Sequence, residues 1–342
     1  MKAHPRATAA LALTAAVGLV VSGCQPADAG GDGEEMDRIS SMSIATGGTS
    51  GVYYPIGGAL SGVIADNLEG TSASVEATGA SVENLRLIDS GSADIAIAQG
   101  DSVDQAYNAT GDFDDEEPIT TRALAVLYPN VYHTVTLSSI QDRLGLECFA
   151  DLEGHRYSVG DVGSGNETTT NQVFESLGLD VTSDIDRSQL GYAETSNALT
   201  SGGLDAGSWV VGEGHSGINE LAATDDVSLV PMCDDEITQI LDGAGGYTEH
   251  TIPGGTYTGV DEDVQTIATW NVLVVPEGFN EDQAYELTQA VFDNLDQLSE
   301  VYAPLEDYIT PENMEHSPVP FHAGSMRYFE EAGIEVPADL AG

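Results

Sequence analysis

The residues best suited to chemistry lie in one glycine-rich stretch, IATGGTSGVYYPIGGAL, from Ile44 to Leu60. Apolar residues recur at helical spacing after Pro55, which predicts a strand end, a turn, and a helix whose unpaired N–H groups face that turn. Glycine lets the backbone approach a ligand closely, and the helix N-terminus favours a negatively charged group. The candidate ligand-binding residues of this turn are Thr46, Gly47, Gly48, Thr49, Ser50, Gly51 and Tyr53.

Two known phosphate-binding motifs do not match this turn. No Lys follows the glycines, as a P-loop requires, and the spacing G-x-G-x-x-G is absent. Taken alone, the glycines therefore fit either an anion-binding turn or a purely structural one.

Further turns follow expected strands in the same way. The sequence predicts strands over 72–78 and 93–99, each followed by a turn, and a later turn at Gly163-Ser164-Gly165 opens another helix. Alternating strands and helices form a largely parallel sheet, and ligands bind at the carboxyl ends of its strands. We therefore expect these turns to line one cleft. They add Thr78, Gly79, Ser81, Gln99, Asp101, Gly163, Ser164, Gly165, Asn166 and Glu167 to the candidates.

Few side chains are available to hold a charged ligand. Arg86 is the cation most suited to assist, or else it forms a surface ion pair, and Asp101 or Glu167 could take the ammonium group of an amino acid. Tyr53, Tyr192 and Trp209 either wall the cleft or belong to the core. We predict that a small mono- or dicarboxylate, similar to glutamate, is held mainly by helix N-termini.

The chain is long enough for two lobes. Expected strands cross into a second lobe near residue 129 and return from it near residue 266. We assign residues 40–128 and 266–342 to lobe I and residues 129–265 to lobe II. The expected fold class is α/β, with two mixed, mainly parallel sheets flanked by helices and a hinged cleft between them.

The N-terminus has the pattern of a lipoprotein signal. Met1 to Gly23 combines a short cationic opening with an apolar run too short for a comfortable membrane span, and Val21-Ser22-Gly23 precedes Cys24. We expect cleavage before Cys24 and its lipidation, which would hold the protein at the outer face of the cell membrane, extracellular or periplasmic; an uncleaved anchor helix is the alternative. Residues 24–39 then form an acidic, flexible tether.

The charge balance is strongly acidic, with 57 acidic residues against 9 basic ones. Without residues 1–23, seven Arg remain against the same 57 acids, a formal charge of −50. Such a surface excludes binding to nucleic acid or to anionic lipid. The apolar fraction of 41% is normal for a globular protein, so we interpret the charge as adaptation to molar salt, where the Debye length falls to about 3 Å.

Two cysteines, Cys148 and Cys233, remain if Cys24 is lipidated. Outside the cell an even pair can be oxidised, so a disulfide is possible, although the sequence gives no distance between them.

The chain resembles the TAXI family, the solute-binding receptors of TRAP-type tripartite transporters. The resemblance covers the opening motif and four later blocks: Ser158 to Thr168, Gly191 to Ala206, Ile252 to Val275, and Val319 to Ile334. It implies a type II-like periplasmic-binding-protein fold, one small carboxylate solute such as glutamate, and a TRAP-type integral membrane permease as partner. Asn166 stands where Thr is more usual in the family, and the shortage of basic residues is also a departure.

The main alternative is an enzyme on the same fold that acts on a small carboxylate. The seven His have no close metal-ligand spacing, and Ser164 lies in V-G-S-G and not in the G-x-S-x-G of hydrolases. An adhesin or structural surface protein would explain the anchor but not two cleft-facing turns. We therefore expect a monomeric receptor without catalytic activity, cofactor or metal.

Overall fold

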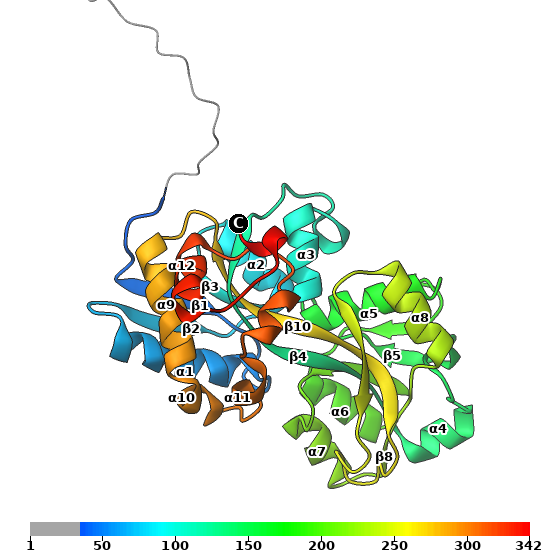
Figure 1. Cartoon of the computed structure of the whole chain (residues 1–342). Helices are drawn as coiled ribbons and strands as arrows, with labels where there is room; N and C mark the ends of the chain where they lie inside the picture. Colours follow the sequence, from blue (N-terminus) through cyan, green and yellow to red (C-terminus); the bar gives the residue numbers. More distant parts are fainter. Residues whose placement is uncertain (1–34) are drawn as a thin grey trace, which may run out of the picture. The chain divides into compact units, whose positions relative to one another are not determined.

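The computed structural model describes residues 35–342, which form one compact unit with a mixed sheet and flanking helices (Figure 1). The strands are β1 (Ser41–Ala45), β2 (Ser72–Glu76), β3 (Ile95–Gln99), β4 (Thr121–Leu137), β5 (Arg156–Ser158), β6 (Asp186–Ser188), β7 (Ala206–Val211), β8 (Val227–Leu229), β9 (Tyr247–Ile252) and β10 (Val264–Pro276). Within residues 35–342, no helix is both long and apolar enough to cross a membrane.

The helices follow the strands in alternation over most of the chain. They are α1 (Tyr53–Asn67), α2 (Ser81–Asp89), α3 (Gly100–Asn108), α4 (Ser138–Leu144), α5 (Gly165–Ser176), α6 (Tyr192–Thr200), α7 (Ser216–Ala222), α8 (Asp234–Gly243), α9 (Glu281–Asp293), α10 (Leu295–Ser299), α11 (Leu305–Tyr308) and α12 (Ala323–Ala332), with short 3-10 turns η1 (Gly111–Phe113), η2 (Phe149–Leu152), η3 (Glu312–His316) and η4 (Ala338–Leu340).

The strands run in the order β2-β1-β3-β10-β4-β7-β5-β6. Pairing is parallel among β2, β1 and β3 and among β7, β5 and β6, as the alternation of strands and helices predicts. All pairings of β4 and β10 are antiparallel, and these two long strands join the two parallel groups into one mixed sheet. The expected two sheets are therefore continuous through β4 and β10.

The hydrophobic cores separate into two lobes. The first lobe is built on β1 to β3, with core residues such as Ile44 and Phe321, and the second is built on β5 to β7, with core residues such as Phe174 and Trp209. The division falls within both long strands: Tyr128 and Val272 belong to the first core, whereas Val131 and Ala268 belong to the second. Figure 1 shows β4 and β10 passing side by side from one lobe to the other.

The ladder between β10 and β4 is irregular where the strands leave the first lobe. Its register shifts between Trp270 and Val272 and again between Leu273 and Val274. The side chain of Asn271, fully buried, donates to the carbonyl of Tyr128 at 2.8 Å and accepts from the hydroxyl of Tyr53. The Asn271 side chain therefore ties the irregular part of β10 to β4 and to the start of α1.

Residues 35–39 differ from the expected flexible tether. Arg38 forms an ion pair with Glu286, and Ile39 exchanges backbone hydrogen bonds with the side chain of Gln283 in α9. Met36 donates its N–H to the carbonyl of Gly278 at 2.7 Å. These residues pack on the first lobe because α9 offers polar side chains beside β1. Cys24 and the rest of the predicted signal and tether lie outside the described residues.

A disulfide joins Cys148 to Cys233, with a Cα–Cα distance of 5.5 Å. The carboxylate of Glu236, which is buried beside it, accepts hydrogen bonds from the N–H groups of Phe149, Ala150 and Cys233. The disulfide therefore fixes the start of α8 against η2 within the second lobe.

Candidate functional site

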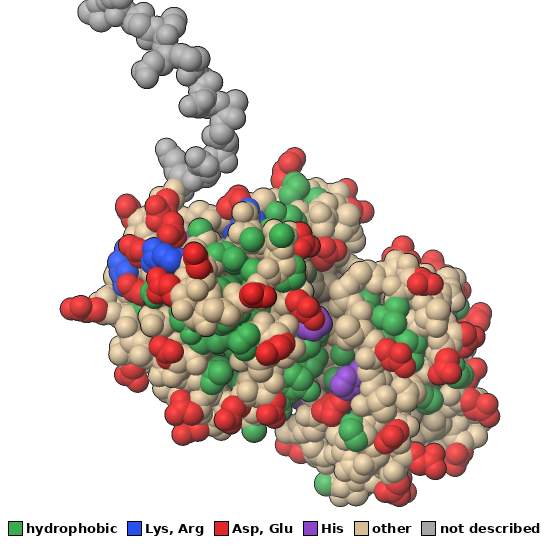
Figure 2. Space-filling view, in the orientation of Figure 1, with side chains coloured by type: hydrophobic (Ala, Val, Ile, Leu, Met, Phe, Trp, Pro, Cys, Tyr) green, Lys and Arg blue, Asp and Glu red, His purple; other side chains and the backbone are tan. Residues whose placement is uncertain are grey.

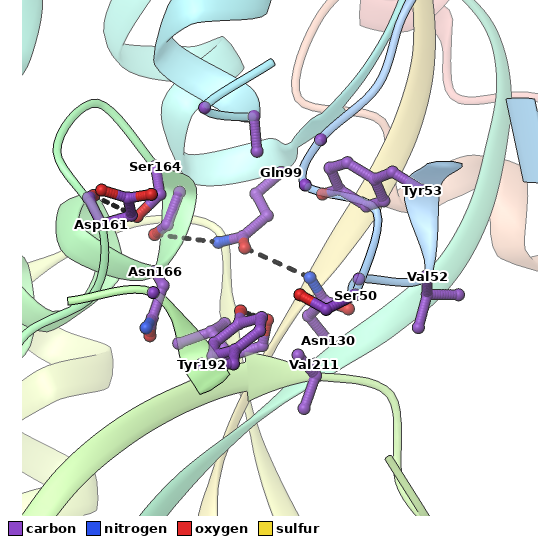
Figure 3. A pocket seen from close by; sticks show the side chains of 18 of the residues that line it. Ser50, Val52, Tyr53, Gln99, Asn130, Asp161, Ser164, Asn166, Tyr192 and Val211 are labelled. Carbon is purple, nitrogen blue, oxygen red and sulfur yellow. Dashed lines mark hydrogen bonds between the residues drawn. The ribbon is translucent and has the colours of Figure 1, made fainter. Parts of the chain in front are cut away.

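A cavity of about 130 Å³ lies between the two lobes. Its first-lobe lining comes from the turns before α1 and α2, and its second-lobe lining from the turns before α5 and α6 (Figure 3). The lining residues are Gly47, Gly48, Ser50, Gly51, Val52, Tyr53, Thr78, Gly79, Ala80, Gln99, Tyr128, Asn130, Asp161, Ser164, Gly165, Asn166, Gly191, Tyr192, Val210 and Val211.

The first-lobe turns are held together by Asn84, a fully buried residue of α2. Its amide donates to the carbonyls of Thr46 and Ile97, and its Oδ1 accepts from the hydroxyl of Thr78 at 2.6 Å. One side chain therefore fixes the ends of β1 and β3 and the turn before α2. The adjoining Ala80 has φ +84°, a conformation that costs a non-glycine residue roughly 1–3 kcal/mol and that clusters at functional sites.

The N-terminus of α1 presents unbonded donors to the cavity. Its N-cap, Val52, provides no capping side chain. Among the described residues, the N–H groups of Val52 and Tyr53 have no hydrogen-bond acceptor, and both residues line the cavity. Unpaired donors at a helix start are the groups that bind anions in proteins.

The N-terminus of α5 faces the same cavity from the second lobe. Its N-cap, Ser164, accepts from the N–H of Glu167 and donates to the carbonyl of Asp161 at 2.6 Å. Within residues 35–342, the N–H groups of Gly165 and Asn166 have no acceptor. Two helix N-termini from opposite lobes therefore offer donors to one cavity.

Gly165 is required by the close contact between the lobes. A Cβ at this position would lie 2.6 Å from Ser81 Oγ and 2.7 Å from Gln99 Cδ, both in the first lobe. The side chain of Gln99 donates to the carbonyl of Gly165 at 3.2 Å and accepts from Asn130 Nδ2 at the same distance (Figure 3). Gln99 thus forms the floor of the cavity and bridges the lobes.

Two buried amides leave acceptors without partners in the cavity lining. Asn130 Nδ2 is used by Gln99, and Asn166 Nδ2 donates to the carbonyl of Ser208 at 3.0 Å. The Oδ1 atoms of Asn130 and Asn166 have no donor within the described part of the chain, although both side chains are at least 96% buried. The carboxylate of Asp161 lies at the exposed rim. Buried unsatisfied acceptors indicate a missing donor group.

Aromatic rings wall the cavity. Tyr53, Tyr128 and Tyr192 line it, and burial raises the pKa of each hydroxyl well above its usual value, so all three stay neutral. Trp209 stacks on the outer face of Tyr192, with ring centroids 5.9 Å apart, and is itself fully buried. Trp209 therefore supports the wall without lining the cavity.

Cationic side chains are missing from the cavity lining in the described part of the chain. Within residues 35–342, no Arg, Lys or His lines it. Arg86 pairs with Glu116 and lies over the ring of Phe113. Of the two roles predicted for Arg86, the structure therefore agrees with a surface ion pair and not with a cation that assists ligand binding. The other six arginines that the structure describes also pair with acids: Arg38 with Glu286, Arg122 with Glu277, Arg143 and Arg156 with Asp205, Arg187 with Glu167, and Arg327 with Glu281 and Asp282. Figure 2 shows acidic side chains over both lobes and basic ones at few places.

Twelve of the 19 predicted binding residues line the cavity: Gly47, Gly48, Ser50, Gly51, Tyr53, Thr78, Gly79, Gln99, Ser164, Gly165, Asn166 and Tyr192. Seven do not: Thr46, Thr49, Ser81, Asp101, Gly163, Glu167 and Trp209. Thr46 and Ser81 are buried and bond the backbone of Glu76 and Gln99. Thr49 is exposed on the turn, and the backbone of Gly163 is bonded by Glu83 and Glu167.

Neither predicted ammonium-binding carboxylate faces the cavity. Glu167 pairs with Arg187 and accepts from Gln189. Asp101 is 1% exposed and accepts hydrogen bonds from Thr169 and Tyr247 of the second lobe. Burial raises the pKa of Asp101, and this effect outweighs the hydrogen bonds, which lower it. Among the described residues, the carboxylate that lines the cavity is that of Asp161, and not that of Asp101 or Glu167. Asp161 was not among the predicted binding residues although it belongs to the block SVGDVGSGNET. The other cavity-lining residues that were not predicted are Val52, Ala80, Tyr128, Asn130, Gly191, Val210 and Val211.

Solved structures share this architecture. MatC from Rhodopseudomonas palustris with bound malate superposes with a TM-score of 0.52 at 13% identity, over 86% of this chain and 96% of that chain. XAC2383 from Xanthomonas citri bound to a chloride ion gives 0.51 at 9% identity, over 86% and 100%. The periplasmic aliphatic sulphonate binding protein SsuA from Escherichia coli gives 0.43 at 14% identity, over 88% and 95%. The first two matches confirm the expected fold class, an α/β fold with a mixed sheet flanked by helices.

The sequence also matches a family model over most of its length. The match extends from residue 44 to residue 333, and so includes both lobes and every cavity-lining turn. The chain belongs to the NMT1-like family.

Proposed function

We propose that this protein is an extracytoplasmic receptor that captures a small carboxylate-bearing solute between its lobes and delivers it to a membrane permease. The observation that carries the proposal is the pair of unbonded helix N-termini, of α1 and α5, which reach one cavity from opposite lobes. A carboxylate between them would be held by backbone N–H groups without any basic side chain.

The ligand class is a small amino acid similar to glutamate. The unpaired Oδ1 atoms of Asn130 and Asn166 need a donor, and an ammonium group supplies several. Asp161 adds a negative charge at the rim. A carboxylate at the helix N-termini and an ammonium group at these three oxygens would satisfy both kinds of unpaired group. A plain dicarboxylate would satisfy only the first.

The size of the cavity supports a small ligand. A volume of about 130 Å³ would hold on the order of ten waters, since each needs roughly 10–15 Å³ of such space. Two structural neighbours carry small anions by their titles, malate for MatC and chloride for XAC2383. Both agree with a cavity that accepts negative charge.

The contacts of Ser164 support binding over catalysis. Its hydroxyl donates to the carbonyl of Asp161 and accepts from the N–H of Glu167, so it acts as a helix cap. No His among residues 35–342 lines the cavity to activate it as a nucleophile.

We further place the protein in the TAXI subfamily, with a TRAP-type permease as partner, on the resemblance of the opening motif and the four later blocks. The proposal includes lipidation at Cys24, a location at the outer face of the cell membrane, adaptation to molar salt, and a monomeric receptor. Lobe I would comprise residues 40–128 and 266–342, and lobe II residues 129–265, with motion between them.

Titration calorimetry in molar salt tests the proposal with L-glutamate, L-glutamine and L-malate. We expect L-glutamate to bind, and Asp161→Asn to weaken it by roughly 2- to 5-fold while leaving L-malate unaffected or tighter, because only the amino acid carries an ammonium group and salt screens the exposed carboxylate. Asp186→Asn, an exposed position in the same lobe, is the matched control and should change nothing. Absence of binding for all three solutes, or turnover of any of them, would contradict the receptor.

A further inference from the structure

The lobes are also joined outside the cavity, by hydrogen bonds that end on a buried carboxylate. Asp101, in the first turn of α3, accepts at one oxygen, Oδ2, from Thr169 Oγ1 of α5 and from the hydroxyl of Tyr247 at 2.9 Å. Its other oxygen accepts from the N–H of Ser102 at 2.7 Å. Thr169 and Tyr247 belong to the second lobe, so the first lobe supplies the acceptor and the second supplies the donors.

The direction of these bonds follows from the protons available. Thr169 and Tyr247 each carry one hydroxyl proton, and in both contacts the hydroxyl is the donor and Asp101 Oδ2 the acceptor. Thr169 Oγ1 is then free to accept from Gln99 Nε2 at 2.9 Å. The hydroxyl of Tyr247 also lies within hydrogen-bond distance of Gln172 Oε1, so its one proton is shared between Asp101 and Gln172, whereas Thr169 donates to Asp101.

Hydrogen bonds of Gln99 connect Asp101, Thr169 and Tyr247 to the cavity. The same Nε2 that donates to Thr169 also donates to the carbonyl of Gly165, and Oε1 of Gln99 accepts from Asn130. Asp101, Thr169 and Tyr247 themselves do not line the cavity. Thr168, the neighbour of Thr169, forms a similar bond to Asp112 of the first lobe.

We propose that Asp101, Thr169 and Tyr247 form a latch that holds the lobes together without ligand and thereby sets ligand affinity from outside the cavity. This inference rests on the proposed function only for the identity of the ligand; the contact between the lobes does not depend on it. When the lobes separate, Thr169 and Tyr247 lose their acceptor. A receptor whose binding-competent state is only fractionally populated binds more weakly by that fraction, so weakening the latch weakens binding.

The latch also suits a protein with so many acids. Hydroxyl donors carry no charge, so molar salt, which screens exposed ion pairs, leaves these buried bonds in place. Losing one of these bonds leaves a buried acceptor without its donor, which corresponds to a change of roughly 10- to 100-fold in the ratio of closed to open protein.

The test compares Thr169→Val, which removes the hydroxyl and keeps the shape, with Thr169→Ser, which keeps the hydroxyl. Thr170→Val is the matched control, because Thr170 is equally buried in the same helix but bonds Ser208 and Tyr132 within the second lobe. Tyr247→Phe is the second variant, in case Thr169→Val fails to fold. The readout is the radius of gyration of ligand-free protein in molar salt, measured by small-angle scattering.

We expect Thr169→Val and Tyr247→Phe to increase the radius of gyration, whereas Thr169→Ser and Thr170→Val match the parent. Equal radii for the parent, Thr169→Val and Tyr247→Phe would overturn the latch. This measurement needs no ligand, so its result is independent of the proposed function. In a titration with L-glutamate, we expect Thr169→Val to bind roughly 10- to 100-fold more weakly than the parent. An unchanged affinity would also overturn the proposal.

Discussion

Replacing Gly165 by Ala should force the two lobes apart and weaken ligand binding. The added Cβ would lie 2.6 Å from Ser81 Oγ, whereas ordinary contacts begin at 3.4 Å, so the surfaces must separate by about 0.8 Å. Ser81 cannot yield easily, because it is fully buried and its Oγ accepts from the N–H of Gln99 at 3.1 Å. The φ of Gly165 is not in the left-handed region, so Ala fits the backbone itself.

The cost of such overpacking is roughly 1–3 kcal/mol, which corresponds to about 5- to 150-fold weaker binding if it falls only on the closed state. We would measure L-glutamate affinity by calorimetry and the radius of gyration by small-angle scattering, both in molar salt. Gly58→Ala is the control: Gly58 lies inside α1, and a Cβ there meets nothing within 4 Å. If Gly165→Ala binds as tightly as Gly58→Ala, the contact between α5 and the first lobe does not govern binding.

Three further predictions concern stability. The melting temperature should rise from millimolar to molar salt, because a formal charge of −50 is screened; calorimetric scans that show no change would contradict this. Replacing both Cys148 and Cys233 by Ser should destabilise the fold by roughly 4–5 kcal/mol, from the 85-residue separation they close, as measured by urea unfolding against the oxidised parent. Burial lowers the pKa of His133 to about 4, below the ordinary 6.5, so the unfolded state binds more protons between these values and stability should fall as pH falls from about 6.5 to 4. Urea unfolding of His133→Gln across this range should show a flatter dependence, and an unchanged slope would exclude His133 as its source.

The cavity-lining turns could be predicted because their signals are local. A strand, a glycine-rich turn and a helix with apolar spacing lie within about twenty residues at Ile44 to Leu60, and again around Gly163 to Gly165. Parallel pairing of β1 with β2 and β3 then brings the ends of the strands to one edge, as expected for alternating elements.

The direction of individual side chains could not be predicted in the same way. Asp101 and Gln99 are two residues apart, yet only Gln99 lines the cavity, because Asp101 faces Thr169 and Tyr247, which are 68 and 146 residues away in sequence. Asn130 lies within β4 between Pro129 and Val131, and these sequence neighbours give no sign of a binding role. In each case, contacts with residues distant in the sequence determine where the side chain lies.

The two long strands set the mechanical properties of the molecule. Because residues 268–276 of β10 pair with residues 121–131 of β4, the angle between the lobes can change only if both strands bend together. Bending is easiest where ladder bonds are already missing, which is the irregular segment of β10 from Trp270 to Val274. Asn271 lies within this segment and contacts the hydroxyl of Tyr53 at the cavity wall. One side chain therefore connects the irregular segment of β10 to the wall of the cavity.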